Sequence, residues 1–231
     1  MSQEVSIKII ARIHNDFPTK FGIPRQSGLI DSLKATIVFE PEYRNPDALR
    51  GLEGYSHLWL LWQFSEAVRG GSWSPTVRPP RLGGNIRMGV FATRSPFRPN
   101  AIGLSSVKLD KIELDSNLGP VLQVSGADLM DGSPIFDIKP YLSYTDSHPE
   151  ATSGFAFPSK EGVLEVRFPD VWVEKVPGNK LEALVSVLAQ DPRPAYQDNT
   201  DRIYKMEFAG VEVHFTVMGK VLTVCNIVCN H

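Results

Sequence analysis

The sequence contains no long apolar run and no leader-like start. None of its apolar segments approaches the roughly 20 residues that a helix needs to span a bilayer. The opening MSQEVSIKII also lacks a basic segment followed by an apolar one, which is the pattern of a secretory signal. We therefore expect a cytoplasmic protein that does not associate with membranes.

Cysteine is scarce as well. The two cysteines, Cys225 and Cys229, lie in the apolar stretch VLTVCNIVC, and His231 follows shortly after. No fourth ligand follows at a usual metal-site spacing, and the five histidines are scattered along the chain. We expect reduced thiols that pack as small hydrophobic side chains, and no bound metal.

The signature motifs of several common enzyme classes are missing. The sequence has no G-x-x-x-x-G-K-S/T phosphate loop, no G-x-G-x-x-G between a strand and a helix, and no G-x-S-x-G nucleophile elbow. These absences argue against P-loop nucleotide hydrolases, Rossmann dinucleotide enzymes and α/β-hydrolases.

Net positive charge is also missing, because 24 lysines and arginines oppose 26 aspartates and glutamates, which gives −2. Any contact with nucleic acid must therefore be local. Residues 75–103 gather positive charge, with five arginines, five prolines and no acidic residue. Guanidinium groups on stiff loops suit a polyanion or a carboxylate, because each presents a planar fork of donors. The alternative is a solvated loop whose arginines pair with acids elsewhere.

The chain does contain many short apolar stretches separated by Gly, Pro and Asp turns. The strand-like stretches are residues 5–13, 35–40, 57–64, 102–114, 121–127 and 135–141. Residues 57–64 are apolar enough for a central strand buried on both faces. Residues 87–93 allow a further strand, and Asn45-Pro46 predicts a short helix that ends near Leu52. So little helix predicts a mainly β N-terminal domain, either a barrel or a sandwich, over residues 1–146.

The pattern changes after a Pro-, Ser- and Gly-containing stretch at residues 147–162, which we interpret as a linker. Residues 163–168 are strand-like, and Asn179 with Glu182 resembles a capping box before a helix that ends at Asp191-Pro192. Strands are expected over residues 203–208, 211–217 and 221–228. Residues 163–231 therefore predict a small α+β domain.

Five strings make the chain recognisable: FGIPRQSG, RGLEGYSHLWLL, SPTVRPPRLGGNIRMGVFATRSPFRPNAIG, GADLMDGSPIFDIKPYL and LAQDPRPAY. Together they span nearly the whole chain, and they resemble the TrmO family, also called YaeB- or TsaA-like. The resemblance implies a methyltransferase that uses S-adenosylmethionine to methylate the exocyclic nitrogen of threonylcarbamoyladenosine at position 37 of threonine tRNA. It also implies a β-barrel fold for the cofactor, unlike the Rossmann methyltransferases, and a homodimer with the cofactor near the subunit interface.

The resemblance also implies which residues bind the cofactor. They are Pro24, Arg25, Gln26, Phe64, Ser65, Arg94, Leu104, Ser125, Gly126, Ala127 and Asp128. An Asp can accept hydrogen bonds from ribose hydroxyls or an ammonium group, an Arg suits a carboxylate, and turn backbone can bind the adenine edge. His57 is either a cofactor residue or a hydrogen-bonded histidine at a strand edge.

A second set of residues is predicted to contact tRNA. Arg78, Arg81, Arg87 and Arg98 are candidates for anticodon-loop phosphates or for negative charge that develops on the substrate, and Asn85 and Asn100 for the modified base. Asp191, Arg193 and Tyr196 either close over that base or form a rigid connector. We predict direct in-line transfer and name no general base. Two rival hypotheses are a non-catalytic single-stranded RNA-binding barrel and a methyltransferase acting on another nucleoside or a small molecule.

Overall fold

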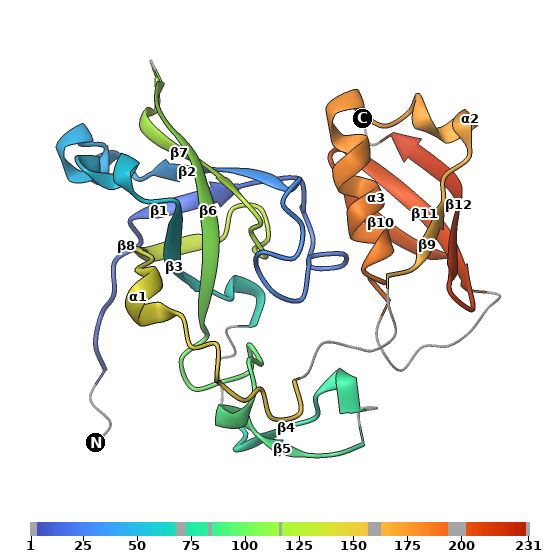
Figure 1. Cartoon of the computed structure of the whole chain (residues 1–231), viewed down its shortest axis with the longest axis horizontal. Helices are drawn as coiled ribbons and strands as arrows, with labels where there is room; N and C mark the ends of the chain where they lie inside the picture. The colour runs from blue at the N-terminus through green and yellow to red at the C-terminus, as the bar shows by residue number, and fades with distance from the viewer. Residues whose placement is uncertain are drawn as a thin grey trace.

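Six strands of the N-terminal half form a closed barrel in the order β1-β2-β7-β6-β3-β8 (Figure 1). The structure is a computed structural model that describes residues 4–67, 73–82, 85–115, 117–156, 163–193 and 202–229. The strands are β1 (Ala11–His14), β2 (Lys34–Phe39), β3 (His57–Gln63), β6 (Ile102–Asp115), β7 (Gly119–Ser125) and β8 (Pro134–Pro140). All six pairings around the barrel are antiparallel. The predicted mainly β N-terminal domain is confirmed, and it is a barrel rather than a sandwich.

The barrel interior explains the apolar content of β3. Leu58, Leu60 and Trp62 point into the core and are at most 6% exposed, whereas the residues between them are half-buried. The prediction that this strand is buried on both faces was therefore wrong. A barrel strand has one interior and one exterior face, so every second side chain lies outside whatever its polarity.

The irregular parts of the N-terminal half differ from prediction. The strand expected over residues 5–13 is only β1, and the helix expected after Asn45 is a pair of 3-10 turns, Pro46–Leu49 and Leu52–Gly54. Asn45 does cap the first turn, because its Oδ1 accepts a hydrogen bond from Asp47 N at 3.0 Å. Gly51, at φ 88°, separates the two turns. Within residues 87–93 only β5 (Met88–Gly89) is strand; it pairs with β4 (Thr76–Val77) and is followed by a 3-10 turn at Val90–Ala92.

The C-terminal part is the predicted small α+β unit. Its sheet has the order β10-β11-β12-β9, formed by β9 (Glu165–Arg167), β10 (Tyr204–Phe208), β11 (Val211–Met218) and β12 (Val221–Cys229). Helices α2 (Asp170–Val173) and α3 (Leu181–Ala189) precede β10, and α1 (Ser143–Asp146) lies before them in the chain. The predicted Asn179 cap was wrong, since Asn179 lies inside a 3-10 turn and Lys180 occupies the N-cap of α3.

The two cysteines also differ from expectation. Cys225 and Cys229 are both free thiols and both exposed, so they do not pack as core side chains.

Among the described residues no group of His, Cys, Asp and Glu side chains is arranged to hold a metal ion. Within the same part of the chain, no helix has the length and apolar character needed to cross a bilayer.

A long loop between β1 and β2, residues 15–33, connects the barrel to the C-terminal sheet. The Phe17 ring packs edge-on against Phe208, with ring centroids 5.2 Å apart. The Asp16 carboxylate accepts a hydrogen bond from Lys180 Nζ at 2.7 Å, and the Asp16 carbonyl accepts one from Ala209 N at 3.0 Å. Helix α3 lies on the barrel side of the sheet (Figure 1). The same loop carries Pro24, Arg25 and Gln26, so its anchoring bears on the candidate site.

Candidate active site

The Asp128 carboxylate lies at the end of a chain of hydrogen bonds that starts in the barrel interior. Ser105 Oγ donates to Asp128 Oδ1 at 2.5 Å, and Trp62 Nε1 donates to Ser105 Oγ at 2.9 Å. Burial raises the pKa of Asp128 above its ordinary value, although the Ser105 hydrogen bond, the charge of Arg94 and the Ser27 amide act in the opposite direction. A carboxylate held in this way is a ready acceptor for hydroxyl or ammonium donors.

Two backbone turns meet beside Asp128. Gly28 N donates to Gly126 O at 2.8 Å, and Gly126 N donates to Leu33 O at 3.0 Å. Gly126 has φ +74°, and a Cβ there would lie 3.3 Å from both Cα and N of Gly28. Ser27 Oγ accepts from Ser106 N at 3.2 Å, which ties the 24–28 loop to the edge of β6. The glycine is required both by its backbone conformation and by the close approach of the two chain segments.

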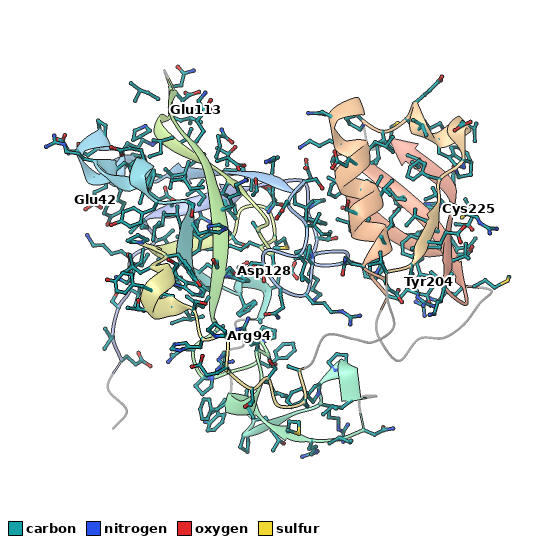
Figure 2. All side chains as sticks on the ribbon, viewed as in Figure 1. Glu42, Arg94, Glu113, Asp128, Tyr204 and Cys225 are labelled. Atoms are coloured by element: carbon teal, nitrogen blue, oxygen red, sulfur yellow. The ribbon has the colours of Figure 1, made fainter. Side chains whose placement is uncertain are left out.

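Arg94 joins this cluster from the arginine-rich stretch. Its Nη1 donates to Gln26 Oε1, and Gln26 Nε2 donates to the carbonyl of Arg25. Figure 2 places Arg94 between Asp128 and the β4–β5 ribbon. The structure therefore brings the predicted 24–26 loop, Arg94 and the 125–128 turn together.

The other predicted cofactor residues occupy varied positions. Phe64 packs against Trp62 with ring centroids 4.2 Å apart, and Leu104, beside Ser105, is 56% exposed. Pro24 and Ala127 are buried, and Ser65 is exposed at the end of β3. The hydroxyl of Ser125 donates to Asp110 and accepts from Lys34 Nζ at 2.6 Å, so Ser125 faces the site only through its backbone.

His57 lies apart from the cluster. It begins β3, five residues before Trp62, which corresponds to roughly 16 Å along a strand. Its ring is exposed, and Nδ1 lies 3.0 Å from Ser56 Oγ. Of the two interpretations of His57, this position matches the hydrogen-bonded histidine at a strand edge.

The predicted RNA residues divide into exposed and engaged side chains. Arg78, Arg87, Asn85 and Asn100 are exposed. Arg98 Nη1 donates to the carbonyls of Thr93 at 3.0 Å and Ser95 at 3.3 Å, so Arg98 shapes its own loop. The side chain of Arg81 and the whole of Tyr196 lie outside the described part of the structure.

Asp191 and Arg193 form a compact turn that contacts the cofactor loop. The Arg193 guanidinium donates twice to the Asp191 carboxylate, at 2.8 Å each, and the Arg193 carbonyl accepts from Arg25 Nη2 at 3.3 Å. Asp191 has a positive φ of 50°. This geometry corresponds to a rigid connector, and it reaches the same loop as Gln26.

Three residues of the cluster were missed in the sequence: Ser27, Trp62 and Ser105. The signal for Ser105 was a polar residue at an inward position of a strand, where alternation predicts an apolar one. Its neighbour Gly103 lies opposite Trp62, and a Cβ at Gly103 would lie 2.3 Å from Trp62 Cε2. The glycine therefore makes room for the indole that holds Ser105.

A hollow of about 500 Å³ lies elsewhere, along the outer part of the β6–β7 hairpin. Its described lining includes Lys111, Glu113, Leu118 and Gln123 and none of the predicted cofactor residues. We place the candidate site at Asp128 rather than in this hollow, because Asp128 combines a half-buried carboxylate with nearby turn backbone and an arginine.

Comparison with known proteins identifies the family. The tRNA-methyltransferase O N-terminal domain model matches residues 12–147, and the TrmO C-terminal domain model matches residues 163–230. An Escherichia coli K12 protein named tRNA (adenine(37)-N6)-methyltransferase is 41% identical over 216 residues, covering 90% of this chain and 91% of the relative. A Methanothermobacter thermautotrophicus protein named as a probable S-adenosyl-L-methionine-binding protein is 37% identical over 144 residues, covering 62% of this chain and 95% of the relative.

The crystal structure of TrmO from Pseudomonas aeruginosa is similar along the whole fold. It superposes with a TM-score of 0.78 at 31% sequence identity, covering 98% of this chain and 100% of that chain. Agreement of this kind, together with both domain models, means that the chain belongs to the TrmO family.

Proposed function

We propose that this protein, a tRNA (adenine37-N6)-methyltransferase of the TrmO family, transfers the methyl group of S-adenosylmethionine to the exocyclic nitrogen of threonylcarbamoyladenosine in threonine tRNA. The observation that carries the proposal is the convergence of the half-buried Asp128, the 24–28 loop and Arg94 on one side of the barrel. The family relatives support the reaction class, and the cluster supports this location for it. We place the reaction in the cytoplasm.

The cluster fits the chemistry of S-adenosylmethionine. Asp128 can accept hydrogen bonds from the ribose hydroxyls or the ammonium group, and Arg94 can bind the carboxylate. The backbone of the two turns that meet at Gly28 and Gly126 can bind the adenine edge, and Leu104, the residue before Ser105 in β6, offers an exposed apolar surface. When bound, S-adenosylmethionine supplies an electrophilic methyl group.

The protein's own residues contribute orientation and electrostatics. Holding a substrate nitrogen in line with its partner can be worth about 7–11 kcal/mol of the barrier. The accepting nitrogen is flanked by a purine and a carbonyl. When this nitrogen loses its proton, negative charge develops on the neighbouring carbonyl. Arg94, one of the five arginines of residues 75–103, lies in the cluster, and positive charge there stabilises such a transition state. We assign no general base.

We also propose that two copies of the chain form a homodimer near the cofactor. Ile102 and Leu104, at the start of β6, are 36% and 56% exposed. Apolar side chains at a site rim are a common feature of surfaces that a second subunit covers. Sedimentation velocity at micromolar concentration tests this point: a monomer would contradict it.

The substrate claim has a direct test. The purified protein is incubated with S-adenosylmethionine and with threonine tRNA that carries or lacks the threonylcarbamoyl group, and digested nucleosides are weighed by mass spectrometry. We expect one added methyl group on the modified nucleoside alone. Transfer to unmodified adenosine would refute the substrate, and no transfer to either RNA would favour the non-catalytic RNA-binding alternative.

The cofactor site is tested separately by titration calorimetry. Arg94→Ala removes a charged hydrogen bond, so we expect the affinity for S-adenosylmethionine to fall by about 1.5–3 kcal/mol, roughly 10- to 150-fold in Kd. Arg50→Ala is the matched control, because Arg50 is 80% exposed in its side chain and lies in the 46–54 turns. An unchanged Kd for Arg94→Ala would show that the cofactor binds elsewhere.

A further inference from the structure

The short β4–β5 ribbon has an outer face with exposed aromatic and arginine side chains near its two ends. Its register pairs Thr76 with Gly89 and Val77 with Met88, and Val90 N donates to Pro75 O at 2.9 Å, which continues the pairing. Alternation therefore puts Val90, which is 1% exposed, on the inner face with Val77 and Met88. The outer face carries Thr76 and Gly89. Phe91 follows at one end, in the 3-10 turn Val90–Ala92, and Arg78 and Arg87 lie one residue beyond the Val77–Met88 pair at the other end.

The end of the ribbon at Phe91 is aromatic. Phe91 is 71% exposed and Trp73 is 51% exposed, and their rings lie 5.9 Å apart at 34° to each other. Two large aromatic side chains gathered in water form an apolar surface of the kind that marks a binding site. Flat, exposed aromatic rings are also the groups on which proteins stack unpaired bases.

The second end is cationic. Arg78 and Arg87 are both exposed, and neither makes a hydrogen bond or ion pair with another described residue. Arg78 follows Val77 and Arg87 precedes Met88, so the two like charges lie at the same end of the ribbon and repel, and residues 75–103 contain no acidic residue to offset them. This pair therefore has an unmet preference for an anion.

The middle of the outer face carries the small residues Thr76 and Gly89. A Cβ at Gly89 would meet no other atom within 4 Å, so open space lies above the ribbon between the aromatic and cationic ends. Arg87 precedes the strand Met88–Gly89, and Phe91 lies in the 3-10 turn that follows it, so the two ends are a few residues apart. A single-stranded nucleic acid alternates flat bases with phosphates along its length, so one base at Phe91 and a neighbouring phosphate at the arginines can be bound at once.

We propose that the outer face of the β4–β5 ribbon is a platform for the anticodon loop, where Phe91 and Trp73 stack an unpaired base and Arg78 and Arg87 bind loop phosphates. The proposal rests on the proposed function and deepens it. A second copy of the chain is the other candidate occupant. A two-fold pairing through this face would gather four guanidinium groups in one interface with no carboxylate of residues 75–103 to offset them, because the same patch is used by both subunits. RNA therefore fits the face better.

The test measures binding of a fluorescently labelled threonine anticodon stem-loop by anisotropy over a range of salt concentrations. Loss of base stacking in Phe91→Ala is expected to weaken the affinity about 5-fold or more, whereas Phe91→Tyr keeps it. Replacing Arg78 and Arg87 by Gln is expected to flatten the salt dependence by about one unit of slope for each phosphate that the protein no longer binds. Leu114→Ala is the control, because Leu114 is 78% exposed at the far end of β6 and should have no effect.

Two further measurements separate this proposal from its alternatives. Sedimentation velocity of Phe91→Ala should match the unsubstituted protein, and calorimetry should give an unchanged Kd for S-adenosylmethionine. An unchanged RNA affinity in Phe91→Ala, or a change of oligomeric state that accounts for the weaker binding, would overturn the platform. Retained RNA binding through Phe91 without any methyl transfer would instead refute the proposed function and leave the platform standing.

Discussion

The Asp128 carboxylate is held in a setting that disfavours its charge. Burial is the largest influence and raises its pKa, and the opposing contributions of Ser105, Arg94 and Ser27 do not cancel it. A half-buried acid with a raised pKa lowers the stability of the folded chain at neutral pH. Shifted acids of this kind occur most often at functional sites, where a ligand supplies the missing partners.

Asp128→Asn is therefore expected to bind S-adenosylmethionine roughly 10- to 150-fold more weakly while folding at least as stably at neutral pH. The sign follows from linkage: above the ordinary value of 3.8 the folded state retains the Asp128 proton longer than the unfolded state does. The stability that Asp128 contributes therefore falls as pH rises through that range. Calorimetric unfolding from acidic to neutral pH checks this, with the gain of Asp128→Asn shrinking toward acid.

Asp31→Asn is the control for that experiment. It makes the same change of charge at an exposed position of the 15–33 loop. A clear loss of stability in Asp128→Asn at neutral pH, with Asp31→Asn unchanged, would contradict the view that the Asp128 charge is unfavourable to folding.

At the scale of elements, alternation in the sequence predicted the barrel strands and the C-terminal hairpins, but it misjudged the outer face of β3. Trp59 lies on that outer face, where Nε1 donates to Asp146 Oδ2 at 2.8 Å and the ring packs against Tyr141 with centroids 5.5 Å apart. An apolar run has the same sequence pattern whether the strand is buried between two layers or covered on its outer face by a loop or short helix, as residues 141–146 cover Trp59. Periodicity alone cannot distinguish these cases.

The candidate site shows a similar limit. The family strings named the 24–26 loop, Arg94 and the 125–128 turn, and the structure brings these together. The contact of Ser105 with Asp128 could not be predicted from the sequence, because strand register and barrel closure decide which residue an inward serine contacts. Its partner Asp128 lies 23 residues away in the chain.

The turn at Gly126 allows a matched comparison. Gly126 and Gly132 have nearly the same positive φ, +74° and +73°, but only a Cβ at Gly126 would press on Gly28. Alanine at either position should cost about 1 kcal/mol of unfolding free energy, because left-handed backbone is strained for residues with a Cβ. Only Gly126→Ala should also weaken cofactor binding, since it displaces the 24–28 loop. Urea unfolding and titration calorimetry measure the two effects, and equal Kd values would contradict the role of the close approach.

At the scale of the whole molecule, the C-terminal domain holds the loop that carries the cofactor residues. Phe17, Ile30 and Leu33 of the loop belong to the same buried cluster as α3 and the C-terminal sheet. A Cβ at Gly22 would lie 2.2 Å from Met206 Sδ, so the Met206 side chain packs directly on the loop backbone. The sequence predicted two units and a C-terminal domain that covers or extends the first domain's site, but the residues in contact could not be predicted, because they lie far apart in the chain. The boundaries proposed at residues 146 and 163 stay a prediction.

The ion pair between Asp16 and Lys180 tests this coupling. The two side chains are 15% and 26% exposed, so removing the ammonium leaves a largely buried carboxylate without its partner. Lys180→Met should lower the unfolding free energy by about 1–3 kcal/mol. Lys8→Met should change it by less than about 0.5 kcal/mol, because the Lys8–Glu42 pair is 73% and 68% exposed.

The double variant Asp16→Asn with Lys180→Met completes a cycle, and a coupling energy of about 0.5–3 kcal/mol is expected for groups in direct contact. If the C-terminal domain positions the 15–33 loop, Lys180→Met should also weaken S-adenosylmethionine binding. Lys180 is the N-cap residue of α3 and is not one of the predicted cofactor residues. Denaturant unfolding and calorimetry on the same samples give both quantities. A coupling energy near zero, or a loss of stability without any change in cofactor Kd, would contradict the view that the C-terminal domain positions the cofactor loop.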